Sequence, residues 1–149
     1  MASYSLYDAG SQLKVQILAI GTYAPEACLV MPKEYGSYQP PQAKNYWVNI
    51  EMVEEYREAE TANSYLQHFT LEVWVWVAIP SRVDEVAEYQ ADRVQAILDK
   101  LEYNTLGGWA RVGLDNDSLG RVKYVKGNVS TNARYGAHFT VKVTKQVTV

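Results

Sequence analysis

The chain has 149 residues, of which 48% are hydrophobic and 21% are charged, and its formal net charge at neutral pH is −3. A length near the usual domain size predicts a single domain, residues 1–149, with one hydrophobic core. The composition is too apolar for a disordered chain, and the acidic total argues against a dedicated nucleic-acid-binding protein.

The first part of the chain predicts a helix followed by an irregular arm. Between Leu6 and Ile20 the apolar residues recur at spacings of three and four, which favours an amphipathic helix that ends at Gly21. Gly10 weakens this pattern, and a strand that begins near Leu13 is the alternative. Residues 22–45 contain four of the five prolines, so we predict an extended, turn-rich arm. An arm of this length inside a compact domain usually has a function, such as contact with a neighbour.

The middle of the chain predicts two strands joined by an acidic stretch. Residues 45–55 alternate between apolar and polar side chains, as expected for a half-buried strand. In Gln67–Ile79 every second residue is apolar, so a register slip of one residue would expose the whole apolar face. The stretch Glu54–Ser64 is either a mobile hairpin loop or an acidic docking surface. The acidic residues of this candidate docking surface are Glu54, Glu55, Glu58 and Glu60.

The C-terminal half predicts one helix and two further strands. Pro80 ends the long strand, and Ser81 with Asp84 suits the N-terminal cap of an amphipathic helix from about Arg82 to Leu101. Turn residues then separate a strand at residues 121–126 from a final strand at 133–147. We therefore predict an α+β fold, in which an antiparallel sheet of about four strands carries two helices on one face.

No catalytic, cofactor-binding or metal-binding motif is recognisable, so we assign no residue to these roles and expect the protein not to be an enzyme. His68 and His138 fall on the same predicted sheet face, but a zinc site would need another ligand. We therefore interpret them as exposed or interfacial. Asp115–Gly120 resembles the start of a calcium loop, but no acidic residue follows to complete it.

The single cysteine, Cys28, excludes an internal disulfide and any site with several thiolate ligands, and we interpret it as a small buried hydrophobe. No apolar run reaches the roughly 18 residues of a membrane span. No signal peptide is recognisable either, so we expect synthesis in the cytoplasm and no membrane partner.

Three tryptophans form the candidate oligomer interface. Trp47, Trp74 and Trp76 are predicted to project from the sheet face opposite the helices. Several indole rings exposed to water would be unusual for a monomer. Either the arm at residues 22–45 covers them or a neighbouring subunit does.

Charge is distributed unevenly along the chain. Residues 118–149 carry a net charge of +6 without any acidic residue, whereas residues 1–117 carry −9. Such a chain can pair opposite patches head to tail between copies, or it can present two solvated faces that have no partner. Phosphate contact is disfavoured, because the pI is 5.4 and no aromatic stacking set accompanies the basic residues. The candidate basic patch consists of Arg121, Lys123 and Lys142.

The order of the predicted elements resembles that of the tail terminator, or tail completion, proteins of long-tailed bacteriophages and related contractile particles. The similarity covers about residues 5–145. It comprises an N-terminal helix, a Pro-containing segment, the strand Tyr46–Met52, an acidic loop, the strand Phe69–Val77, a Pro-Ser-Arg exit into a helix, and two closing strands. The long arm at residues 22–45 departs from the family pattern.

The resemblance implies a virion structural protein of the tail or neck that is assembled in the host cytoplasm. In this family six copies form a ring that caps the head-proximal end of the tail tube, stops tube polymerisation and joins the tail to the neck. The implied partners are further copies in a homohexamer, the tail tube protein, a neck or connector protein, and the sheath protein where the tail is contractile. DNA would pass through the lumen without sequence-specific binding, and no cofactor is implied. The acidic stretch would contact the tube or neck, or line the lumen.

Two other interpretations remain open. The chain could be a different phage structural subunit, such as a head–tail connector, a tail tube protein or a minor capsid protein. It could also be a small-molecule-binding α+β domain with a pocket between the arm and the tryptophan face, which would require a convergent polar cluster.

Overall fold

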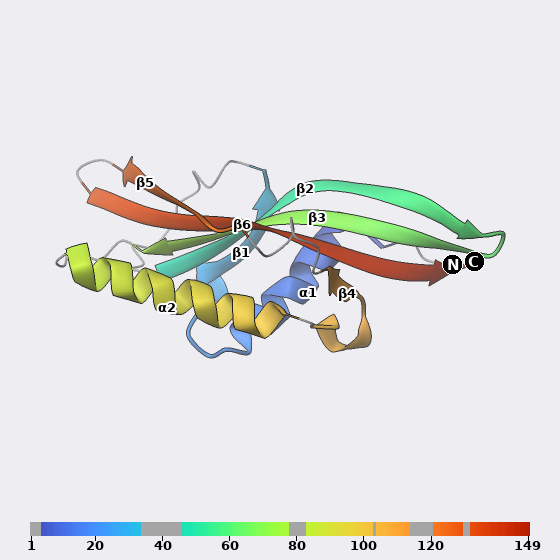
Figure 1. Cartoon of the computed structure of the whole chain (residues 1–149), viewed down its shortest axis with the longest axis horizontal. Helices are drawn as coiled ribbons and strands as arrows, with labels where there is room; N and C mark the ends of the chain where they lie inside the picture. Colours follow the sequence, from blue (N-terminus) through green and yellow to red (C-terminus); the bar gives the residue numbers. More distant parts are fainter. Residues whose placement is uncertain (1–3, 34–45, 78–82, 103, 114–120, 130–131) are drawn as a thin grey trace.

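The computed structural model describes residues 4–33, 46–77, 83–102, 104–113, 121–129 and 132–149. A six-stranded sheet lies across two α-helices, which both cover the same sheet face (Figure 1). In chain order the elements are α1 (Leu6–Leu18), η1 (Pro25–Ala27), β1 (Cys28–Pro32), β2 (Tyr46–Thr61), β3 (Ser64–Val77), α2 (Val83–Leu101), η2 (Leu106–Gly108), β4 (Arg111–Gly113), β5 (Lys123–Val129) and β6 (Asn132–Thr148). None of the described helices is long and apolar enough to cross a membrane.

The sheet has the strand order β1-β2-β3-β6-β4, and β5 pairs with β6 on the same side as β4. All pairings are antiparallel except that of β1 with β2. The α+β class and the four predicted strands are confirmed, but the predicted number of strands was too small. The two additional strands, β1 and β4, have only five and three residues. Strands this short cannot show an alternating pattern that sequence reasoning would detect.

Part of the predicted arm is regular structure. Cys28–Pro32 forms β1, which pairs parallel to β2 at the edge of the sheet. The proline is tolerated because it ends an edge strand, where no ladder hydrogen bond is lost. The extended, turn-rich arm predicted for residues 22–45 therefore includes a short edge strand. Residues 34–45 of the arm lie outside the described residues.

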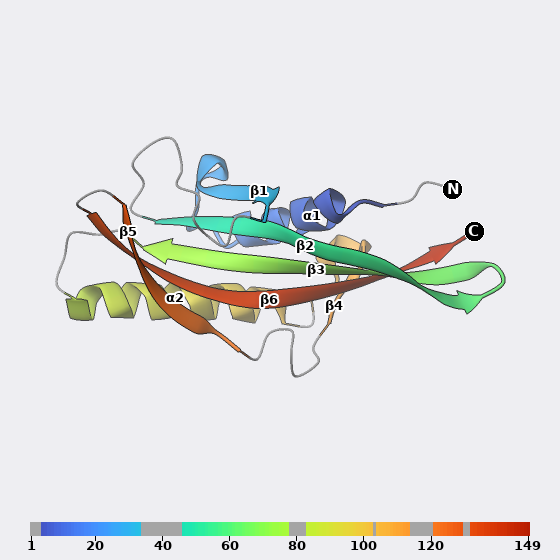
Figure 2. The same cartoon turned by 90° about the horizontal axis from the view of Figure 1, so that it is seen from above.

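The acidic stretch is a strand and not a loop. Strand β2 continues to Thr61, and β3 begins at Ser64. Together β2 and β3 form a ribbon that extends well beyond both helices, with the end of β6 beside it (Figure 2). The side chains of β2 from Glu54 to Thr61 are all exposed, so the apolar alternation that identifies a strand is absent there. A register shift between Met52 and Glu54 also interrupts the pattern.

The apolar face of β3 is the centre of the core, as its alternation predicts. The side chains of Phe69, Leu71, Val73, Val75 and Val77 are fully buried. They pair across the sheet with apolar residues of β6 and pack against both helices. Burying one such side chain contributes roughly 1.5–3 kcal/mol, so the combined burial determines which face of β3 points inward.

Both predicted helices are present. The N-terminus of α1 has a capping box, in which Ser5 and Asp8 each bond the backbone N–H of the other. The alternative strand from Leu13 was wrong. Gly10 has a packing role, because a Cβ atom there would lie 2.6 Å from Val30 Cγ1 of β1. Helix α2 begins at Val83, and its predicted cap at Ser81 lies outside the described residues.

The thiol of Cys28 is expected to be unreactive in the native protein. Its side chain is fully buried in the core, and burial raises the pKa of the thiol to about 12. A thiol reagent should therefore modify the native chain only as fast as it unfolds, and the urea-unfolded chain at once. Rapid stoichiometric labelling of the native protein would contradict this burial.

The same thiol makes stability depend on pH. Its folded-state pKa lies above its ordinary value of 9.0, so the folded state holds this proton more tightly than the unfolded state. The resulting stabilisation is complete below pH 9 and is lost as the pH rises toward 12. Between about pH 8 and about pH 10.5, the free energy of unfolding should fall less for Cys28→Ala than for the wild type.

Candidate interaction surfaces

The predicted tryptophan interface is a buried cluster within the single chain. Trp47 on β2 and Trp76 on β3 lie directly opposite each other, with ring centroids 6.1 Å apart. Trp74 stacks on Trp76 at 5.5 Å. The three side chains, which we call the tryptophan cluster, are 1%, 8% and 3% exposed for Trp47, Trp74 and Trp76.

The arm segment contributes to this burial. Ala27 of η1 belongs to the same cluster as the three rings. The single chain therefore covers its own tryptophans, which is the first of the two alternatives stated for them. The other alternative, cover by a neighbouring subunit, is not needed to bury these three rings. Alternation along a strand shows which face a residue occupies, but it does not show what a distant segment places on that face.

Two carboxylates lie side by side next to this cluster, on the sheet face opposite the helices, which we call the outer face. Glu51 and Glu72 are directly opposite in the pairing of β2 with β3. Glu51 is 1% exposed, and its Oε1 accepts a hydrogen bond of 2.7 Å from Trp74 Nε1. Glu72 Oε2 accepts a hydrogen bond of 2.8 Å from Thr140 Oγ1, and Glu72 Oε1 interacts with His138 Nδ1. Like charges in this arrangement repel, so these partners are needed to hold the pair.

The two histidines share the outer face, as predicted, but neither is an isolated exposed side chain. The ring of His138 stacks on Trp74 with centroids 4.1 Å apart. His68 Nε2 lies 2.8 Å from Glu58 Oε2, and His68 Nδ1 lies 3.2 Å from Thr144 Oγ1. Each histidine thus contacts an acidic residue of a neighbouring strand, Glu58 for His68 and Glu72 for His138, and one further side chain of the sheet. Sequence reasoning missed these pairs because their partners come from other strands.

The described residues contain no group of three or more His, Cys, Asp or Glu side chains that could hold a metal ion. The carboxylates and histidines of the outer face instead bond to each other and to hydroxyl groups. Such an arrangement orders these side chains on the sheet.

The charge of Glu51 can be separated from its hydrogen bond by two substitutions. Glu51→Leu is expected to lower the free energy of unfolding by about 1–3 kcal/mol, because the buried N–H of Trp74 loses its acceptor. Glu51→Gln retains an acceptor and removes the repulsion from Glu72, so its stability should equal or exceed that of the wild type. Urea denaturation compares the two. A glutamine variant as unstable as the leucine variant would show that the negative charge itself is required.

The predicted acidic residues divide into two groups. Glu58 bonds to His68, and Glu60 Oε1 accepts a hydrogen bond of 2.6 Å from Gln146 Nε2. Glu54 and Glu55 are exposed and have no interaction partner among the described residues. The register shift at Met52/Glu54 places Glu54 opposite Thr70, on the outer face, so Glu55 points to the helix face.

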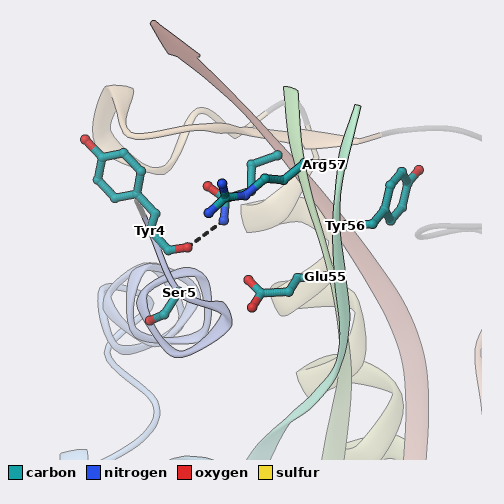
Figure 3. A pocket seen from close by; sticks show the side chains of 6 residues that line it. Tyr4, Ser5, Glu55, Tyr56 and Arg57 are labelled. Carbon is teal, nitrogen blue, oxygen red and sulfur yellow. Dashed lines mark hydrogen bonds between the residues drawn. The ribbon is translucent and has the colours of Figure 1, made fainter. Parts of the chain in front are cut away.

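A pocket of about 300 Å³ lies on the helix face beside the N-terminus of α1 (Figure 3). Gln67 is 2% exposed, and its Nε2 donates a hydrogen bond of 2.6 Å to the carbonyl oxygen of Tyr4, which anchors the start of the chain to β3. Glu55 and Arg57 bring opposite charges to the opening. The lining residues are Tyr4, Ser5, Glu55, Tyr56, Arg57 and Gln67.

The predicted basic patch is only partly assembled. Lys123 of β5 lies opposite His138, while Lys142 lies opposite Thr70 and Gly113, farther along β6. Arg121 and Lys123 are exposed and have no interaction partner among the described residues. Lys142 is half-buried and belongs to the middle of the sheet. Among the described residues, the exposed basic side chains of this patch therefore lie at β5.

Lys145 lies beside two aromatic rings, a contact that the sequence pattern did not indicate. Lys145 Nζ lies 4.4 Å from the ring centroid of Tyr4 and 4.7 Å from that of Trp109. It also donates a hydrogen bond to the carbonyl oxygen of Trp109. Because Lys145 pairs opposite Gln67, it lies on the helix face and holds the N-terminal segment against the sheet.

No model of a known protein family matches the chain, and no curated protein matches it. The surfaces themselves must therefore carry the functional argument. Their main feature is a sheet with an acidic edge at the ribbon end of β2 and a basic edge at β5, neither of which pairs with a further strand in the described part of the chain. Edges of opposite charge suit protein–protein contact.

Proposed function

We propose that the chain is a virion structural protein, a subunit of a ring that caps the head-proximal end of a bacteriophage tail tube. The ring would stop tube polymerisation and join the tail to the neck. The observation that supports this proposal is the element order around β3: a helix, a Pro-containing segment, the long β2–β3 hairpin, an amphipathic helix and closing strands. This order is the basis of the resemblance to tail terminator proteins.

Charge supports assembly from copies of one chain. The acidic residues Glu54 and Glu55 lie on β2, and the basic residues Arg121 and Lys123 lie at β5, on the other side of the sheet. A subunit with unlike surfaces on its two sides can contact the next copy head to tail, and such contacts close into a ring when the rotation allows. A sixfold ring is the form that the resemblance implies.

The partners in this proposal are the tail tube protein on one side of the ring and a neck or connector protein on the other. In a contractile tail the sheath protein would be a further partner. DNA would pass through the lumen, where acidic side chains would repel its phosphates and prevent sticking. The protein would be located in the tail or neck of the virion.

Native mass spectrometry of the purified protein tests the proposal. The expected result is a closed ring of six copies, and electron microscopy should show a ring and not a long cylinder. Added to polymerising tube protein, the ring should limit tube length. Long cylinders formed by the protein alone would favour a tail tube subunit. A stable monomer at high concentration, with saturable binding of a small molecule, would favour the ligand-binding alternative.

A further inference from the structure

We propose that the acidic edge of one copy pairs as a β-strand with the basic edge of a second copy, so that the sheets of neighbouring copies become continuous. The acidic edge is the side of β2 that faces away from β3, at residues 54–60. The basic edge is the side of β5 that faces away from β6, together with Arg121 just before this strand. This inference rests on the proposed function, because it specifies the contact between copies in the ring.

The acidic edge has backbone groups available for pairing. Strand β1 pairs with β2 only from Val48 to Met52. Beyond Met52, no strand in the described part of the chain pairs with this side of β2, which continues to Thr61. The side chains from Glu54 to Glu60 are exposed. An exposed edge of this length is a template for another strand.

The basic edge has the same property on the other side of the sheet. Strand β5 pairs with β6 along one side, and no described strand pairs with its other side. Its seven residues approximately match the free length of β2. Tyr124 and Val125 are 58% and 39% exposed, so an added strand would also cover apolar surface.

The charges permit pairing between unlike edges and oppose pairing between like edges. Glu54 and Glu55 on one edge, and Arg121 and Lys123 on the other, have no interaction partner within the chain among the described residues. Two acidic edges placed together would repel, and so would two basic edges. An acidic edge against a basic edge compensates all these charges, which selects a head-to-tail contact between copies.

The position of the two edges suits a repeating contact. The acidic edge lies near the hairpin tip of β2 and β3, and β5 pairs with the start of β6, at the other end of the sheet (Figure 2). Each copy therefore offers one edge of each kind, at opposite sides and opposite ends of its sheet. The two edges of one copy cannot pair with each other, so each edge pairs with a different neighbouring copy.

Charge reversal in the full chain tests this contact. Glu54→Lys with Glu55→Lys, and separately Arg121→Glu with Lys123→Glu, should each raise the dissociation constant of assembly by about 100-fold or more, because every contact then places like charges together. The chain carrying all four substitutions should assemble again, since its edges are complementary once more. Sedimentation velocity and native mass spectrometry measure the assembly, and circular dichroism checks folding.

The matched control is Glu88→Lys with Glu102→Lys, which changes the charge equally at exposed positions of the α2 region. It should assemble like the wild type. If the acidic-edge variant also assembles like the wild type, or if the fourfold variant fails to recover while folding normally, the strand contact is wrong although the ring proposal stands. A wild-type chain that stays monomeric overturns both proposals.

Discussion

Trp76→Ala is expected to lower the free energy of unfolding by about 3–5 kcal/mol, the usual cost of removing a buried aromatic ring. Trp76 is 3% exposed, and its ring stacks with those of Trp47 and Trp74. The loss should be the same at low and high protein concentration, because the contacts that bury the ring are within one chain. Urea denaturation at two protein concentrations, followed by far-ultraviolet circular dichroism, gives this measurement.

A second substitution, Gly136→Ala, tests the contact between Gly136 and the ring of Trp76. A Cβ atom on Gly136 would lie 2.6–2.9 Å from three ring atoms of Trp76, so Gly136→Ala should cost about 1–3 kcal/mol in the wild type. In the Trp76→Ala background the space is empty, and the same change should cost little. The resulting coupling energy reports direct contact between the two residues. A loss that grows on dilution would instead mean that a second subunit covers the ring.

The parts of the fold that depend on local pattern could be predicted from the sequence. The alternation in β3 identified its buried face, because a slip of one residue would expose the whole apolar side. The apolar residues of α2, which recur at spacings of three and four along one side, identified that helix. Both elements have one aliphatic side and one side of mainly polar or aromatic residues over most of their length, and this contrast is what a sequence pattern records.

The remaining parts depend on contacts between distant segments. Strand β1 is too short to show alternation, and the ribbon end of β2 is exposed on both faces, so neither could be identified from its pattern. The burial of Trp76 depends on Ala27 and on the missing side chain at Gly136, which are far from it in sequence. The pairing of His68 with Glu58 depends on strand register across a shift of one residue.

The candidate surfaces show the same division. The acidic and basic residues were identified from composition, which is independent of fold. Their partners were not, because only the structure separates Glu58, which is bound to His68, from Glu54, which has no partner among the described residues. The tryptophan face is buried within the chain, whereas the two strand edges are the surfaces that carry these unpartnered charges. Strand edges are defined by the order of strands in the sheet, which a local sequence pattern does not record.

Shortening the ribbon should separate folding from assembly. Replacing Glu58–Leu66 by Asn-Gly would close the hairpin at the pair Arg57 and Gln67, with a turn suited to two antiparallel strands. The removed side chains are exposed or half-buried, so the shortened chain should remain folded with a modest loss of stability. It should lose assembly, since the acidic edge would end before its last contacts. Native mass spectrometry should find a folded monomer.

Removal of Thr148 and Val149 is the control for this truncation. Thr148 pairs with Ser64, and the backbone N–H of Val149 donates to the carbonyl oxygen of Asn63, so this change also loosens the ribbon tip. It leaves the free side of β2 intact, however, and assembly should persist. If both variants assemble, the ribbon tip is not part of the contact. If only the hairpin truncation dissociates the ring, the effect belongs to the edge of β2 and not to general loosening of the tip.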